Sequence, residues 1–97
     1  MFTKGYYVTA ELKLKDTSRA REAKQALMEL CSETLKEEGC SIFELHQLRE
    51  DDTRFLLWER FDDEEAFKLH FEKEHTRDYL AGNHTEVVQF FVTDIAS

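Results

Sequence analysis

The stretch from Arg54 to His75 changes its hydrophobic pattern midway, and this change constrains the fold more than any other feature of the sequence. The first part alternates as a β-strand does, which places four side chains on one face: Phe55, Leu57, Glu59 and Phe61. An acidic segment from Asp62 to Glu65 follows, and residues at helical spacing then lead to His70. The pattern predicts a strand followed directly by a helix. It also places the Glu59 carboxylate on an otherwise apolar face, where burial is costly.

The rest of the chain predicts three more strands and two more helical segments. The strands are expected over 6–14, 40–48 and 87–92. A helix after the first strand carries one apolar stripe, formed by Ala20, Ala23, Leu27, Leu30, Thr34 and Leu35. Gly39 is the expected left-handed residue after this helix, and a short helix over 77–81 should stop at Gly82-Asn83.

This order, β-α-β-β-α-β, predicts an α+β fold of the ferredoxin-like kind, with a four-stranded antiparallel sheet and the helices on one face. At 97 residues the chain is expected to form a single domain over 1–97. We expect the uncovered face of the sheet to carry an apolar group comprising Ile42, Leu48, Phe55, Leu57 and Phe61. Such a surface predicts a homodimer that packs through its sheet faces.

A turn at Asp51-Asp52 would pair Glu44 with Glu59, and His46 with Leu57, on that uncovered face. Two facing carboxylates destabilise a sheet unless one is protonated or a cation lies between them. One interpretation is a general acid–base site formed by Glu44, Glu59 and His46. The other is a structural ion pair, with an arginine or a partner's lysine neutralising the carboxylates.

His70 and His75 are further candidates for acid–base chemistry. On one continuous helix their rings would point about 140° apart, so they are not expected to share a metal ion. His70 also fits a buried, hydrogen-bonded histidine, and His75 fits a residue favoured by the helix dipole at a C-terminus. No zinc, iron, dinucleotide or phosphate-loop motif is present, so the sequence predicts no metal and no cofactor.

Charge and composition exclude several partners. The formal net charge is -8, from 13 basic and 21 acidic residues, which disfavours nucleic acids and anionic membranes. No apolar run is long enough for a transmembrane helix and no signal peptide is evident, so a cytoplasmic location is expected. Cys31 and Cys40 have no metal-ligand spacing and are expected to be free thiols.

Several segments together resemble the antibiotic biosynthesis monooxygenase domain. They are Lys36-Glu37-Glu38-Gly39-Cys40, Phe43-Glu44-Leu45-His46-Gln47, Arg54-Phe55, Glu59, Phe61, Ala66, His70 and His75. The resemblance implies a ferredoxin-like fold that dimerises through its sheets into an α+β barrel. Members of the family include cofactor-independent oxygenases of quinols and aromatic polyketides, haem-degrading enzymes, and isomerases of a phosphorylated quorum-sensing signal.

Departures from the family patterns narrow this range. Polyketide oxygenases of the family use an Asn, a Trp and a Tyr where this chain has Leu57, Phe61 and Phe67. Haem-degrading members need an Asn on the first strand and a helical His near Leu80, and neither is present. The chain is closer to the quinol oxygenase and signal-isomerase branch, although Glu74 replaces the usual Pro before the second His.

The expected function is therefore oxidation of a small phenolic or quinol-like substrate by molecular oxygen in an apolar pocket. Candidate catalytic residues are Glu59, His70, Glu44, His46 and His75, and candidate substrate contacts are Arg54, Leu57, Phe61 and Phe67. Alternatives are an isomerase of a small phosphorylated dicarbonyl, with Arg54, Arg60 or Lys68 on the phosphate, and a non-catalytic binding or assembly module. The pocket-lining face of the first strand stays open, with Thr9 and Glu11 competing against Val8 and Ala10.

Overall fold

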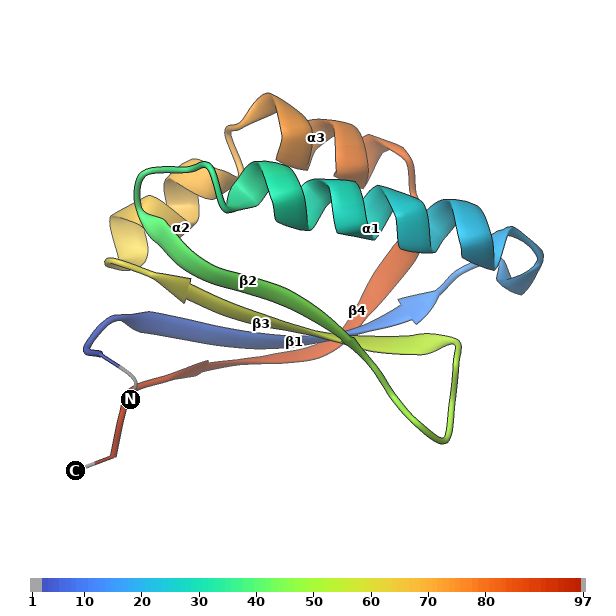
Figure 1. The fold of residues 1–97 in the computed structure, drawn as a ribbon, viewed down its shortest axis with the longest axis horizontal. Coiled ribbons are helices and arrows are strands. Elements are labelled where there is room, and N and C mark those ends of the chain that lie inside the picture. The colour runs from blue at the N-terminus through green and yellow to red at the C-terminus, as the bar shows by residue number, and fades with distance from the viewer. Residues whose placement is uncertain (1–2, 97) are drawn as a thin grey trace.

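A computed structural model describes residues 3–96 and shows the expected ferredoxin-like α+β fold (Figure 1). The elements are β1 (Tyr6–Leu14), a 3₁₀ turn η1 (Thr17–Arg19), α1 (Ala20–Thr34), β2 (Cys40–Gln47), β3 (Arg54–Phe61), α2 (Glu64–His70), α3 (Glu74–Ala81) and β4 (Thr85–Thr93). The four strands form one antiparallel sheet in the order β2-β3-β1-β4, and the three α-helices cover one face of it.

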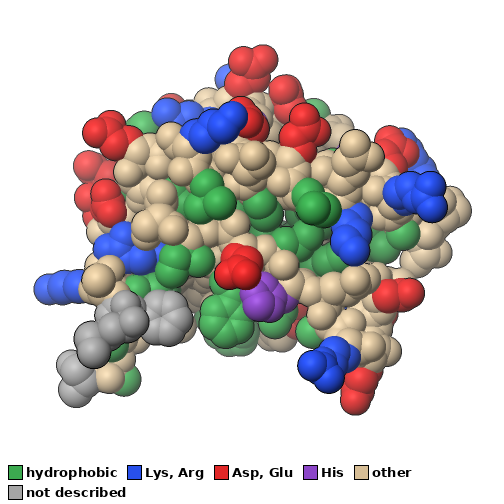
Figure 2. Space-filling view, viewed as in Figure 1, with side chains coloured by type: hydrophobic (Ala, Val, Ile, Leu, Met, Phe, Trp, Pro, Cys, Tyr) green, Lys and Arg blue, Asp and Glu red, His purple; other side chains and the backbone are tan. Residues whose placement is uncertain are grey.

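The core lies between β1 and the predicted apolar stripe of α1. Alternate β1 residues from Val8 to Leu14 are buried, and they meet the α1 stripe of Ala23, Leu27, Leu30 and Thr34. Figure 2 shows apolar side chains in a band between helices and sheet, with charged side chains mostly around its rim. Cys31 and Cys40 are free thiols, as expected. None of the helices in the described part of the chain is long and apolar enough to cross a membrane.

The apolar face of β3 lies under the helices, and its expected position on the uncovered face is wrong. β1 pairs with β3 so that Leu12 lies opposite Phe55, Ala10 opposite Leu57, Val8 opposite Glu59 and Tyr6 opposite Phe61. Residues paired across a ladder share a face, so the buried face of β1 takes these four β3 residues with it. Phe55, Leu57, Glu59 and Phe61 are accordingly all buried.

The β2–β3 register differs by one residue from the expected one. Gln47 pairs with Phe55, so Glu44 lies opposite Trp58 and Phe43 lies opposite Glu59. A slip of one residue moves every side chain of a strand to the other face of the sheet. The expected Glu44–Glu59 pair is therefore wrong. The cause is the loop over 48–53, which closes through a hydrogen bond from the Leu48 amide to the Arg54 carbonyl, 3.1 Å, instead of a tight turn at 51–52.

The uncovered face carries different apolar residues from those expected. Trp58 and Phe91 lie on either side of Thr9 in the ladder and are 45% and 56% exposed. Ile42 is half-buried on the same face, whereas Phe55, Leu57 and Phe61 belong to the core. The apolar character of the face thus persists with a new set of residues.

Gly39 is needed for close packing and not for a left-handed backbone, which corrects the expected cap. Its φ is not positive, and a Cβ built on it would lie 2.6 Å from the Cβ of Ala66 in α2. The Gly39 carbonyl accepts a hydrogen bond from the Asp62 amide, 2.8 Å. The turn before β2 is thereby held tightly against the start of α2, where Asp63 is the N-cap and accepts from the Ala66 amide.

We predict that Gly39→Ala lowers the free energy of unfolding by about 1–3 kcal/mol, because its methyl group overlaps that of Ala66. Chemical denaturation should show this loss. Ala66→Gly alone should cost about 1 kcal/mol through helix propensity. The double variant should then be more stable than the sum of the single effects implies. Additive losses would show that the contact does not limit the packing.

Candidate functional site

An apolar cavity of about 390 Å³ lies between the sheet and the helices. Its lining includes Val8 and Ala10, which belong to the buried face of β1. Phe67 of α2, Phe71 just after α2 and Leu80 of α3 also line it. Five lining residues carry polar side-chain groups: Glu59, His70, Thr76, Tyr79 and Thr85. A largely apolar space with a few convergent polar groups is the usual form of a small-molecule site.

Glu59 is the carboxylate of this cavity. The residue is 7% exposed, and none of the described residues donates a hydrogen bond to its side chain. Burial away from water disfavours the charged form and raises the pKa of Glu59 to about 8. A carboxyl group that titrates near neutral pH can take up or release a proton under physiological conditions.

His70 lines the same cavity from the last position of α2. Its ring packs against those of Phe43 and Phe61, with centroids 5.3 and 5.4 Å away. Burial lowers the pKa of His70, and the Glu37 carboxylate beside it opposes this only in part, so the ring is neutral at pH 7. Its Nδ1 lies 2.8 Å from Glu37 Oε2, which assigns the ring proton to Nδ1 and leaves Nε2 as an acceptor.

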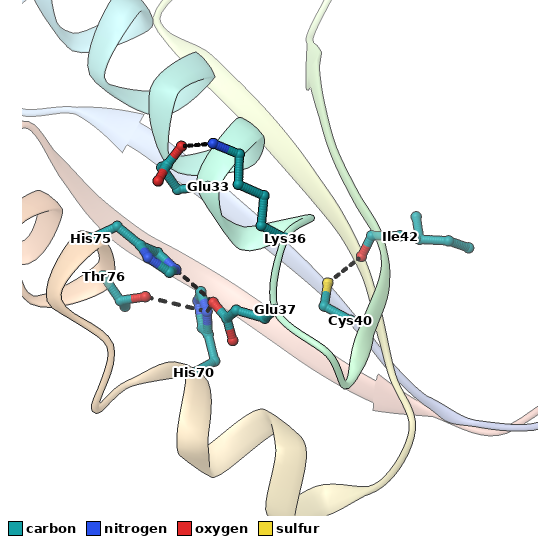
Figure 3. A network of polar contacts seen from close by, with 8 residues as sticks. All are labelled: Glu33, Lys36, Glu37, Cys40, Ile42, His70, His75 and Thr76. Carbon is teal, nitrogen blue, oxygen red and sulfur yellow. Dashed lines mark hydrogen bonds and ion pairs between the residues drawn. The ribbon is translucent and has the colours of Figure 1, made fainter.

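Glu37 also binds His75 through the same oxygen (Figure 3). The distance from His75 Nε2 to Glu37 Oε2 is 2.6 Å, and Thr76 Oγ1 lies 3.2 Å from His70 Nδ1. The expectation that the two histidine rings point apart is wrong, because α2 ends at His70 and α3 starts at Glu74. The break brings the ring centroids to 6.1 Å from each other.

Glu37 was not among the expected site residues, although it belongs to a segment that carried the family resemblance. The sequence gives little indication of a role for Glu37, because Lys36, Glu37 and Glu38 form the charged pattern that is common at the end of a helix. Only the tertiary structure buries its side chain, which is 7% exposed. Tyr79 was also missed; it lines the cavity, burial raises its pKa, and its hydroxyl forms a hydrogen bond with Thr85.

The expected substrate-contact residues divide between the two faces of the sheet. Leu57 and Phe67 line the cavity. Phe61 does not line it but packs against Phe67, with ring centroids 5.5 Å apart. Arg54 lies on the uncovered face, where its Nη1 donates to Glu11 Oε2 at 2.7 Å. It contributes nothing to the cavity of its own chain.

Glu44 and His46 also lie on the uncovered face, and both are exposed. His46 Nε2 is 3.5 Å from Glu44 Oε1, and its ring lies 5.7 Å from that of Trp58. The sheet separates them from Glu59 and His70. Among the five candidate catalytic residues, the structure therefore brings together Glu59 and His70 in the cavity and His75 behind His70.

Comparison with known proteins gives the chain its family. Residues 5–82 match the family model described as antibiotic biosynthesis monooxygenase. A Bacillus subtilis (strain 168) protein described as uncharacterized protein YjcS is 39% identical over 82 residues, which cover 84% of this chain and 78% of that protein.

Solved structures share the fold. A structure of protein YJCS has a TM-score of 0.85 at 35% identity and covers 94% of this chain and 98% of its own. A Bacteroides thetaiotaomicron protein of unknown function, named as a possible oxidoreductase, has a TM-score of 0.83 at 18% identity, with 97% and 100% covered. A structure named antibiotic biosynthesis monooxygenase has a TM-score of 0.80 at 19% identity, with 95% and 97% covered. From the match of its sequence over most of its length, we conclude that this chain belongs to the antibiotic biosynthesis monooxygenase family.

Proposed function

We propose that this chain is a monooxygenase that oxidises a small phenolic or quinol-like substrate within the apolar cavity. One observation carries the proposal: Glu59, a buried carboxylate without a hydrogen-bond donor among the described residues, shares an apolar cavity with a neutral histidine. The family supplies the general reaction class. The cavity supplies the substrate class, because its walls suit an aromatic ring and its polar groups suit a hydroxyl.

Glu59 is the proposed general base. A phenolic hydroxyl has a pKa of about 10, so an ordinary glutamate with a pKa of about 4.3 is too weak a base by roughly six units. With a pKa of about 8, Glu59 narrows this gap to roughly two units. The cause of this gain is the poor solvation of the carboxylate, which loses its charge when it takes the proton.

The oxyanion that forms is electron-rich and reacts directly with oxygen in this proposal. One oxygen atom enters the ring as a carbonyl group, and the other leaves as water with the hydrogens displaced from the hydroxyl and the ring carbon. The substrate supplies the two electrons that reduce the second atom. The atoms therefore balance as substrate plus O₂ giving quinone plus water, with Glu59 returning the proton it accepted.

His70 is the proposed substrate-orienting group. With Nδ1 committed to Glu37, its Nε2 is an acceptor for a second hydroxyl of a quinol or for a proton during the reaction. Glu37 acts through His70 as a positioning residue, since it fixes both the ring orientation and the tautomer. His75 is a second donor to Glu37 and holds that carboxylate in place.

The isomerase alternative finds less support in the cavity. A phosphorylated substrate needs a cation close to the phosphate, and no Lys or Arg is among the described residues that line this space. Arg54 is bonded to Glu11 on the other face, and Lys68 is exposed, 3.7 Å from Glu64. A substrate without a phosphate fits this lining better.

A homodimer that packs through the uncovered faces of two sheets is part of the proposal. Val87 and Phe90 of β4 line the cavity, and both side chains are largely exposed. Trp58 and Phe91 form an apolar group on the uncovered face of the sheet. Packing of two sheets through that face would remove the apolar group from water.

We predict oxygen uptake with a panel of benzo-, naphtho- and anthraquinols, corrected for spontaneous oxidation. Glu59→Gln should lower the rate by about 100-fold or more, because a general base contributes on this order. The wild-type rate should rise with pH up to about 8 and then level, since the ionised carboxylate is the active form. Glu44→Gln is the matched control on the opposite face and should retain activity. Loss in the control but not in Glu59→Gln would overturn the assignment.

We predict a pH-dependent stability difference between wild type and Glu59→Gln. The folded pKa of Glu59, about 8, exceeds the unfolded value of about 4.3, so folding binds a proton between these pH values. The stability of wild type should then fall relative to the variant by up to about 1.4 kcal/mol per pH unit as the pH rises through this interval. Urea denaturation at pH 4, 6 and 8 measures it. A difference that does not change with pH would show that Glu59 is not buried in solution.

We predict a dimer at micromolar concentration, measured by light scattering. Trp58→Glu should shift the mass to that of a monomer, because it places a charge in the apolar group of the uncovered face. Met28→Glu, on an exposed position of α1, is the control and should remain dimeric. A monomeric wild type would disprove this part of the proposal.

A further inference from the structure

We infer that Glu37, His70 and His75 form a binding site for one divalent transition-metal ion such as Zn²⁺. The three side chains offer one carboxylate oxygen and two imidazole nitrogens, all within 4.8 Å of one another. Two histidines and one carboxylate are a ligand set that zinc and other first-row metals accept, with a position left for water. The ligands come from the turn after α1, the end of α2 and the start of α3 (Figure 3).

The distances in the cluster are close to those of a bound state. Ligand atoms of a tetrahedral zinc site lie roughly 3.3 Å apart, as follows from metal–ligand bonds of about 2.0–2.1 Å. Glu37 Oε2 is 2.8 Å from His70 Nδ1 and 2.6 Å from His75 Nε2. For an ion to replace the two hydrogen bonds, the Glu37 oxygen moves outward by about half an ångström and the two imidazole nitrogens, which lie within 4.8 Å of each other, take the same spacing.

The Glu37 charge also favours a cation. Its side chain is buried, and among the described residues the two histidines alone form ion pairs with it. A buried carboxylate charge is costly unless it is paired or bound to a metal, so the site favours a cation at this oxygen. Thr76 Oγ1, 3.2 Å from His70 Nδ1, adds a hydroxyl that can orient a metal-bound water.

A second cavity gives an ion access to this cluster, and it is an observation independent of the ligand distances. It has a volume of about 480 Å³ and lies on the solvent side of His75, whose side chain is 21% exposed. Four carboxylates line it: Glu29, Glu33, Glu74 and Asp78. Lys36 neutralises Glu33, and the other three leave the entrance acidic, which attracts cations.

Metal binding would change what His70 presents to the apolar cavity. An ion on Nδ1 requires a lone pair there, so the ring proton moves to Nε2. His70 then offers a hydrogen-bond donor to the cavity in place of an acceptor. The ion thus sets the tautomer of a residue in the proposed reaction, while metal binding itself does not depend on the proposed function.

The test is a Co²⁺ titration of the untagged, chelator-treated chain, followed by visible absorption and then by Zn²⁺ competition. We expect one ion per chain with a four-coordinate cobalt spectrum that Zn²⁺ removes. Glu37→Gln and His75→Gln should each weaken binding at least tenfold. A raised Tm of the wild type with Zn²⁺, absent in both variants, is the second measurement.

Two histidines outside the cluster provide matched controls. His84→Gln removes a histidine from the same acidic cavity, and His46→Gln removes one from the opposite face of the sheet. Both should bind Co²⁺ as the wild type does. A spectrum of aqueous Co²⁺ only, or equal weakening in His84→Gln and His75→Gln, would overturn the inference. Circular dichroism checks the fold of each variant, and His75→Gln suits this purpose because its side chain is partly exposed.

Discussion

The antiparallel pairing of β1 with β3 is the constraint on which the rest of the structure depends. It places Val8 opposite Glu59 and Ala10 opposite Leu57, so these four side chains all point toward the helices. Burying three large apolar side chains of β3 contributes about 1.5–3 kcal/mol for each. Because side chains alternate, this burial takes Glu59 into the core with them, and its raised pKa limits the cost through protonation near neutral pH.

The carboxylate in the core is therefore a consequence of the same packing that stabilises the sheet. The cavity above it exists because the helices do not close over β4, whose residues remain exposed. The same strands thus stabilise the fold and line the proposed site for a small aromatic molecule. A better-filled core would remove the cavity, and an ion partner for Glu59 would lower its pKa and weaken it as a base.

The cluster of Glu37, His70 and His75 lies between the two cavities. His70 lines the apolar cavity, His75 lines the acidic one, and Glu37 holds both rings from the turn between α1 and β2. The close contact between Gly39 and Ala66 keeps that turn beside α2. In our proposals the cluster fixes the His70 tautomer in the metal-free form through Glu37, and in the metal-bound form through the ion.

The sequence by itself determined the element order, the α1 stripe and the family. It also singled out Glu59, because a charged residue in a strictly alternating strand stands out whichever way the strand faces. These properties follow from local periodicity, which a single segment contains in full.

Only the tertiary structure decided which face of β3 is buried, which residues accompany Glu59, and that Glu37 joins His70 and His75. Register depends on how the loop between two strands closes, and a difference of one residue between 48 and 53 leaves Glu44 and His46 on the uncovered face while Glu59 lies on the covered one. The break after His70 likewise redirected His75, since a short non-helical segment changes side-chain directions that helical periodicity alone would fix. The buried face of β3 is set by its pairing with β1, more than forty residues away in the chain, and local patterns do not contain that pairing.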